Sequence, residues 1–139
     1  MVETTATHPL ADLVPQDFFR DDYISRVLPG GISDLDLIDA AREMKHNVLI
    51  TGPTGSAKTT LVYAAAARAG IPVVNVPCNG AAEPRQFIGG WTPQPDGTFD
   101  FVPGDLVKAV QHGGIIYLDE VNMLPPKIAA FLHGLLDRR

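Results

Sequence analysis

An eight-residue run in the first half of the chain most strongly limits what this sequence can fold into. Residues 52–59 read GPTGSAKT, between a short apolar, β-branched run at 47–51 and a helix-forming run at 60–68. A strand, a glycine-containing loop and a helix with Lys-Thr in its first turn are typical of a phosphate-binding loop. Backbone N–H groups of such a loop and the N-terminus of its helix attract anions. The run therefore predicts an α/β unit that binds nucleotide phosphates.

The residue types in this loop, the Walker A pattern, suggest separate roles. Lys58 is expected to reach the β- and γ-phosphates, and the Thr59 hydroxyl to bind Mg²⁺. The usual pattern has Gly where this chain has Ala57, the smallest residue with a Cβ, and Gly55 keeps one flexible point. A chance glycine-rich turn before a helix is the alternative. The predicted nucleotide-binding residues are Gly52, Pro53, Thr54, Gly55, Ser56, Ala57, Lys58, Thr59 and Thr60.

A second motif lies at 115–120, which read IIYLDE. A buried strand that ends in Asp119 and Glu120 places both carboxylates at its carboxyl end, where ligands bind in open parallel sheets. Asp119 is expected to hold Mg²⁺ as a Walker B aspartate, and Glu120 to act as general base on the attacking water. Such a pair alone would be the polar start of a loop. Together with residues 52–59 it predicts nucleotide binding.

Composition narrows the class of protein. The 139 residues are 45% hydrophobic, which suits one packed domain, and the net charge of −5 argues against a broad nucleic-acid-binding face, although a local basic patch remains open. The single cysteine, Cys78, excludes an internal disulfide or thiolate zinc cluster, and the four histidines lack ligand spacing. Neither a membrane span nor a signal peptide is visible, so we expect a cytoplasmic protein.

Local signals predict the remaining elements. Ser33 is the expected N-cap of a helix that runs to about Lys45, and Gly70 the residue that ends the helix of the phosphate-binding loop. Leu106, Val107 and Val110 are expected to face inward from a short helix. The predicted strands are 47–51, 71–77 and 114–119, and the predicted helices after Ser33 are 58–69, 105–111 and 127–137.

The long connection at 79–103 contains two further features. Residues 87–91, FIGGW, form an apolar cluster with two glycines. The turn signal at 95–97 predicts a hairpin between residues 90–94 and 98–102. Long connections in compact domains are commonly functional, and a solvated excursion is the alternative.

The residues after the second motif resemble a known family. Residues 119–127, DEVNMLPPK, and 135–139, LLDRR, resemble the AAA+ ATPases of the MoxR and dynein-related branch. That branch typically carries Asp-Glu-[Ile/Val]-Asn-x-x-x-Pro and then a helix ending near Leu-Leu-[Asp/Glu]-x-Arg. Ala57 also occurs in relatives, and residues 99–104 resemble the segment entering the family's second helix. The resemblance covers about residues 16–139.

This resemblance implies a three-layer αβα P-loop NTPase with a mostly parallel sheet and a β-hairpin insert near 90–103. Residues 1–31 would then be an N-terminal arm, and 32–139 a partial ATPase domain that stops before the later strands and the helical lid. In the family, the strand between the two motif strands comes later in the sequence. We therefore expect this chain alone to have little or no turnover. A complete minimal domain with another strand order is the alternative.

The resemblance also implies ATP and Mg²⁺ as ligands and an ATP-driven ring, often a hexamer, that remodels or activates a partner protein. Lys58 and Glu120 are the expected catalytic residues, and Asn122 either orients Glu120 or forms a turn. The cluster at 87–91 lies where relatives place a pore loop, and packing within the protein is the alternative. Arg138 and Arg139 lie near the ring interface of some relatives, and solvation is the alternative. Other functions left open are a nucleotide-binding module without turnover and a nucleic-acid motor of this fold. The client protein is not identified.

Overall fold

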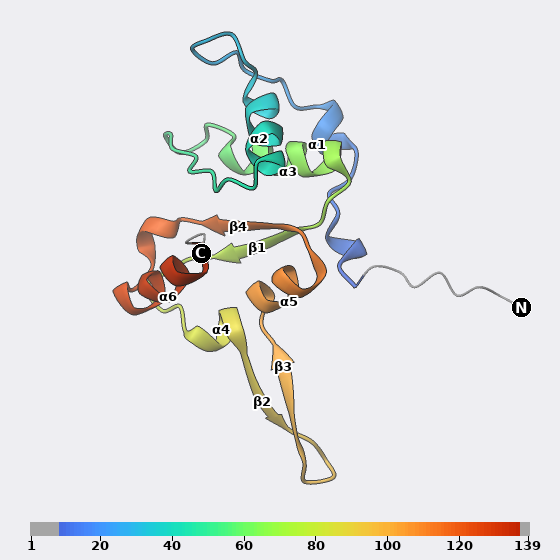
Figure 1. The fold of residues 1–139 in the computed structure, drawn as a ribbon, viewed down its shortest axis with the longest axis vertical. Coiled ribbons are helices and arrows are strands. Elements are labelled where there is room, and N and C mark those ends of the chain that lie inside the picture. The colour runs from blue at the N-terminus through green and yellow to red at the C-terminus, as the bar shows by residue number, and fades with distance from the viewer. Residues whose placement is uncertain (1–8, 137–139) are drawn as a thin grey trace, which may run out of the picture. The chain divides into compact units, whose positions relative to one another are not determined.

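The computed structural model describes residues 9–136. The described chain divides into two compact units, one made of residues 14–73 and the other of residues 9–13 and 74–136. Figure 1 labels the elements of both units, and each unit is considered by itself. Within the described range, no helix is long and apolar enough to cross a membrane.

The unit of residues 14–73 is helical. Its elements are α1 (Phe18–Asp21), α2 (Asp34–Glu43) and α3 (Lys58–Ala69). Four consecutive alanines at 64–67 are buried on α3, and both α1 and α2 pack against this helix. The apolar cluster of this unit centres on Leu35 of α2 and Leu61 of α3. Arg68 of α3 also pairs with Asp36 of α2, at 2.7 Å.

The ends of these helices follow the local sequence signals. The Ser33 hydroxyl accepts a hydrogen bond from the backbone N–H of Asp36 at 3.0 Å, which confirms Ser33 as the N-cap of α2. Gly70 ends α3 in the left-handed region, with φ of 64°. The predicted helix at 58–69 is therefore confirmed at both bounds.

The unit of residues 9–13 and 74–136 contains the paired strands of the core. Strand β1 (Val73–Pro77) pairs with β4 (Ile115–Asp119), and Figure 1 draws both arrows in the same direction. The side chains of Val76, Phe87 and Ile128 are fully buried in the apolar core beside this pair. The surrounding elements are η1 (Ala11–Leu13), α4 (Pro84–Ile88), α5 (Asp105–His112), η2 (Val121–Met123) and α6 (Pro126–Leu136).

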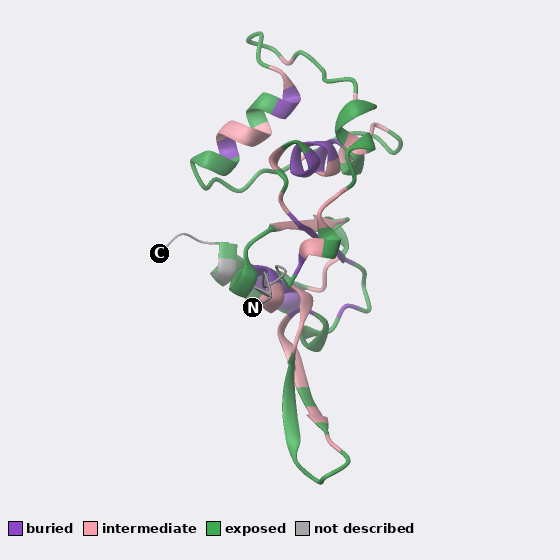
Figure 2. Ribbon diagram, turned by 90° about the vertical axis from the view of Figure 1, so that its right-hand side faces the viewer, coloured by how far each residue is buried: buried purple, intermediate pink, exposed green. Residues whose placement is uncertain are grey.

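The predicted hairpin is confirmed. Strands β2 (Gly89–Pro93) and β3 (Phe99–Pro103) pair antiparallel, with Trp91 opposite Phe101. The turn is closed by a 2.8 Å bond from Gln94 N–H to the Thr98 carbonyl, and Gly97 supplies the positive φ of 84° that the turn needs. Figure 2 colours the outer part of the hairpin as exposed.

The prediction of a strand at 47–51 is wrong, because these residues have no regular structure. The described strands pair only as β1 with β4 and β2 with β3. An extended segment needs a neighbouring strand to satisfy its backbone groups, whatever its β propensity. Val48 and Leu49 are accordingly exposed, and only Ile50 packs against the cluster on α3.

Two helices differ from prediction in which side chains they bury. On α5, Leu106 is buried as predicted, but Val110 is 60% exposed, and Ala109 takes its place in the core. On α6, the helical spacing of the apolar residues predicts a core face made of Ile128, Phe131, Leu132, Leu135 and Leu136. Ile128 and Leu132 are buried, whereas Phe131 and Leu136 are exposed. The side chain of Leu135 and residues 137–139, including Arg138 and Arg139, lie outside the described residues.

Candidate nucleotide site

The loop before α3 has the backbone shape that its sequence requires. Gly55 has φ of +76° and Ala57 has φ of +56°, both in the left-handed region. The Ser56 N–H donates to the Pro53 carbonyl at 3.3 Å, and Ala57 occupies the N-cap position of α3. Lys58 and Thr59 therefore occupy the first helical turn. At Ala57, where the usual pattern has Gly, the left-handed conformation costs about 1–2 kcal/mol.

The Lys58 ammonium folds back over the loop. It donates to the carbonyls of Gly52 at 3.0 Å and Pro53 at 2.9 Å. Phosphate oxygens are stronger acceptors for an ammonium than carbonyls are, because their negative charge attracts the cation. The ammonium is therefore placed at the loop, in contacts that an anion can replace. A Cβ at Gly52 would lie 3.0 Å from the Ser56 hydroxyl and crowd this loop.

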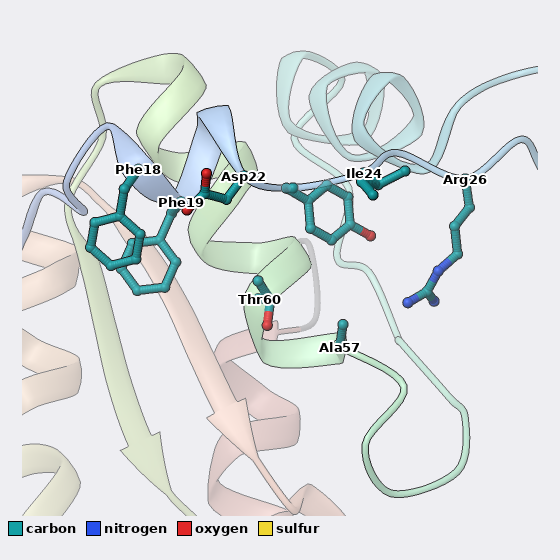
Figure 3. A pocket seen from close by; sticks show the side chains of 8 residues that line it. Phe18, Phe19, Asp22, Ile24, Arg26, Ala57 and Thr60 are labelled. Atoms are coloured by element: carbon teal, nitrogen blue, oxygen red, sulfur yellow. The ribbon is translucent and has the colours of Figure 1, made fainter.

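A cavity of about 530 Å³ lies beside the first turn of α3, within the unit of residues 14–73 (Figure 3). Its walls are mostly aromatic and aliphatic: Phe18 and Phe19 stack with ring centroids 4.2 Å apart, and Phe19 packs against Tyr63 at 5.1 Å. Ala57 and Thr60 join it to the loop. The lining residues are Phe18, Phe19, Asp22, Tyr23, Ile24, Arg26, Ala57 and Thr60.

A buried carboxylate holds one wall of the cavity in place. Asp34, the first residue of α2, accepts hydrogen bonds from the Tyr23 hydroxyl at 2.6 Å and the Ser25 hydroxyl at 2.7 Å. It also accepts from the backbone N–H groups of Arg26 at 3.1 Å and Leu35 at 2.9 Å. Because one carboxylate collects all four donors, the segment 23–26 is tied to the start of α2.

These contacts change two pKa values. Burial alone would raise the pKa of Asp34, but the hydrogen bonds from Tyr23, Ser25 and the two backbone N–H groups outweigh it and hold the pKa below its ordinary value. The pKa of Tyr23 rises from 10.0 to about 12, first because the ring is buried and then because its hydroxyl donates to the negative Asp34. Asp34 is therefore ionised and Tyr23 neutral at neutral pH.

The acidic pair lies at the end of β4, in the other unit. Asp119 is half-buried, and its Oδ1 accepts a hydrogen bond from the Tyr117 hydroxyl at 3.0 Å. Its carbonyl accepts from the Cys78 N–H at 2.8 Å, so the ends of β1 and β4 are joined. Burial, and secondarily the negative charge of Asp119, raise the pKa of the Cys78 thiol.

Glu120 is exposed and has a left-handed backbone, with φ of 56°. Its carbonyl accepts from the Met123 N–H at 2.8 Å, which closes the turn η2 that contains Asn122. A non-glycine residue in this conformation is strained, and such residues concentrate at functional sites. The described positive-φ residues other than glycine are Lys45, Ala57 and Glu120, so two of them lie in the two motifs.

The structure thus assembles the predicted residues in two groups. Residues 52–60 share the unit of residues 14–73 with the cavity, and Asp119 and Glu120 belong to the other unit. Tyr23, Arg26 and Asp34 are not among the site residues predicted from the sequence. Their sequence signal is weak: aromatic residues between 18 and 23, and an acidic residue typical of a helix start.

The two aromatic side chains of the cluster at 87–91 differ in burial. Phe87 is fully buried in the core, so its side chain is not available to contact another protein. Trp91 is 65% exposed and packs edge to face against Phe101, with centroids 5.6 Å apart. A contact role for this segment therefore rests on the hairpin side chains alone.

Comparison with known proteins gives one family match. The model of the AAA domain, dynein-related subfamily, matches residues 47–139. A protein of Staphylococcus haemolyticus is 34% identical over 100 residues, which are 69% of this chain and 38% of the relative. The protein YojN of Bacillus subtilis is 36% identical over 108 residues, 74% of this chain and 36% of YojN. Both are named as uncharacterized, and the chain spans less than two-fifths of either.

Proposed function

The chain belongs to the dynein-related subfamily of AAA domains, a group of AAA+ P-loop ATPases, and on that premise we propose that residues 52–60 bind the phosphates of ATP. Lys58 contacts the β- and γ-phosphates, and the loop N–H groups surround them. The position of Lys58 carries this proposal: its ammonium lies 3.0 Å and 2.9 Å from two loop carbonyls, at the start of α3. The charge of the helix N-terminus adds to this attraction.

We propose that the cavity beside the loop binds the adenosine part of ATP. Its volume of about 530 Å³ lies within the range of small-molecule sites, roughly 300–1,000 Å³. The rings of Phe18, Phe19 and Tyr23 provide apolar walls for a planar base. Thr60 and Ala57 lie on both the cavity and the first turn of α3, so base and phosphates can bind to one continuous surface.

For hydrolysis we propose Asp119 as the Mg²⁺-binding carboxylate and Glu120 as the general base. Carboxylate oxygens are ligands that Mg²⁺ prefers, so Asp119 suits this ion. When bound, Mg²⁺ neutralises charge on the phosphates. The exposed Glu120 carboxylate can accept a proton from water. Its left-handed backbone fixes where that side chain leaves the strand end.

For the whole protein we propose a MoxR-like, cytoplasmic ATPase that forms a ring, often a hexamer, and remodels or activates a protein client. The family match supports the ATPase fold and the common ring assembly of such proteins. The net charge of −5 supports a protein client over nucleic acid. DNA-stimulated turnover would favour a nucleic-acid motor instead, and binding without turnover in the full-length protein would favour an interaction module.

The test is a titration of the chain and its Lys58→Ala variant with a fluorescent ATP analogue. Loss of one charged hydrogen-bonding group costs about 1.5–3 kcal/mol, so affinity should fall about 10- to 100-fold. Lys127→Ala is the matched control, because it removes the same charge from an exposed position on α6, and it should bind like the parent. Equal affinity of Lys58→Ala and the parent would overturn the proposal.

A further inference from the structure

Arg26 lies in a small antiparallel turn that precedes α2. Val27 bridges Ser33, and the Leu28 N–H donates to the Ile32 carbonyl at 2.9 Å. Gly30 and Gly31 close the turn with φ of 101° and 84°, values that glycine adopts without strain. The turn therefore returns the chain to α2 and presents residue 26 beside it.

Asp34 holds the backbone of Arg26 on both sides. The Asp34 N–H donates to the Arg26 carbonyl at 2.9 Å, and the Asp34 carboxylate accepts from the Arg26 N–H at 3.1 Å. Because Asp34 is buried, these bonds have little competition from water. The backbone from which the Arg26 side chain extends is therefore fixed.

The Arg26 side chain reaches the phosphate-binding loop. Its Nη2 donates to the Ser56 carbonyl at 2.6 Å, and the side chain lines the cavity together with Ala57 and Thr60 (Figure 3). Three other arginines of this unit, Arg20, Arg42 and Arg68, pair with carboxylates, whereas Arg26 pairs with none among residues 9–136. Within residues 9–136, no ion pair therefore holds its guanidinium.

Resting on the proposed function, we propose that Arg26 is a second phosphate-binding cation of this site and that Asp34 is its positioning residue. The guanidinium leaves the Ser56 carbonyl when ATP binds and donates to a phosphate oxygen. An anion is the stronger acceptor, and the planar guanidinium can donate two parallel hydrogen bonds to one phosphate. The loop carbonyl holds the side chain near the cavity until the nucleotide arrives.

Arg26→Gln separates this role from a purely structural one. Gln retains N–H donors for the Ser56 carbonyl but removes the charge, and Arg26→Lys retains the charge. Arg20→Gln is the matched control, because Arg20 is an exposed arginine of the same unit that pairs with Asp17 and Asp21. The four proteins are titrated with fluorescent ATP analogue and with unlabelled adenosine as competitor, after circular dichroism has checked that each is folded.

We expect Arg26→Gln to lower the affinity for the ATP analogue about tenfold at low salt, with adenosine affinity unchanged. Arg26→Lys should retain most of the affinity, and Arg20→Gln should bind like the parent. Parental ATP affinity in Arg26→Gln, or equal losses for ATP and adenosine, would overturn the role of Arg26. Lys58→Ala is titrated beside these four proteins. If it lost ATP affinity while Arg26→Gln did not, the proposed nucleotide site itself would stand.

A double-mutant cycle tests Asp34. Asp34 also holds the Tyr23 wall of the cavity, so the cycle is read on the ratio of ATP affinity to adenosine affinity. If Asp34 acts through Arg26, Asp34→Asn should lower this ratio in the parent but not further in the Arg26→Gln background. An equal lowering of the ratio in both backgrounds would overturn the positioning role. The cycle is read at a temperature at which circular dichroism shows all four proteins folded, so a change in stability does not enter the comparison.

Discussion

Replacement of Asp34 by Ala should destabilise the unit of residues 14–73 strongly. The carboxylate is buried and accepts four hydrogen bonds, two from hydroxyls and two from backbone N–H groups. Hydrogen bonds to a charged group contribute about 1.5–3 kcal/mol each, and an unsatisfied buried donor costs about 1–3 kcal/mol. The Tyr23 and Ser25 hydroxyls are part-buried and regain some water contact. We therefore expect a net loss of about 3 kcal/mol.

Urea unfolding measures this loss. The single tryptophan, Trp91, lies in the other unit, whereas two of the three tyrosines, Tyr23 and Tyr63, lie in residues 14–73, so tyrosine fluorescence is the suitable signal. Asp36→Ala is the matched control on the same helix: Asp36 pairs with Arg68 at 2.7 Å, but the two side chains are 56% and 39% exposed. Because water screens both side chains, this ion pair contributes much less to stability than the four buried bonds of Asp34. Equal losses in the two variants would refute the reasoning.

The pH dependence provides a second check on Asp34. Its pKa in the folded chain lies below the ordinary 3.8, so the ionised carboxylate adds stability that is complete above pH 3.8. That stability is lost as pH falls through the lowered pKa of the folded state. The difference in the free energy of unfolding between the parent and Asp34→Ala should therefore shrink in acid. A difference that stayed constant down to about pH 2 would mean that the charge is not its source.

Four further substitutions test other parts of the structure. Glu120→Gln should leave ATP-analogue binding unchanged and abolish hydrolysis in the full-length protein, because an amide is a very poor proton acceptor; parental turnover would place the base elsewhere. Ala57→Gly should raise the thermal midpoint or leave it unchanged, since glycine relieves the left-handed strain while losing more chain entropy; a clear decrease would contradict this account. Phe87→Ala should cost about 3–5 kcal/mol in urea unfolding and Trp91→Ala much less, because only Phe87 is fully buried; similar costs would contradict the burial difference.

Features with a local cause were predictable from the sequence. The α/β P-loop fold class is confirmed by the family match and by helices packed around a core strand pair. The Ser33 cap, the end of α3 at Gly70 and the hairpin turn at 95–97 each depend on a few adjacent residues. The sequence also identified the loop at 52–59, although the roles of its residues remain predictions.

Features that depend on distant partners were not predictable. Residues 47–51 have the composition of a strand, but strand formation requires a neighbour that composition does not reveal. The role of Asp34 could not be predicted, because its partners Tyr23 and Ser25 lie 11 and 9 residues upstream. The apolar run at 87–91 likewise did not reveal that Phe87 enters the core while Trp91 remains exposed.

The thiol of Cys78 is an intrinsic probe of local opening, because the backbone N–H of this residue is bonded to the Asp119 carbonyl. Cys78 is the single cysteine of the chain, the thiol is buried, and its raised pKa keeps it protonated and unreactive at neutral pH. An alkylating reagent can therefore modify the thiol only during an opening that exposes it. Because the backbone of Cys78 is bonded to Asp119, the labelling rate sets an upper limit on how often the strand end that carries the acidic pair opens, and it needs no engineered label.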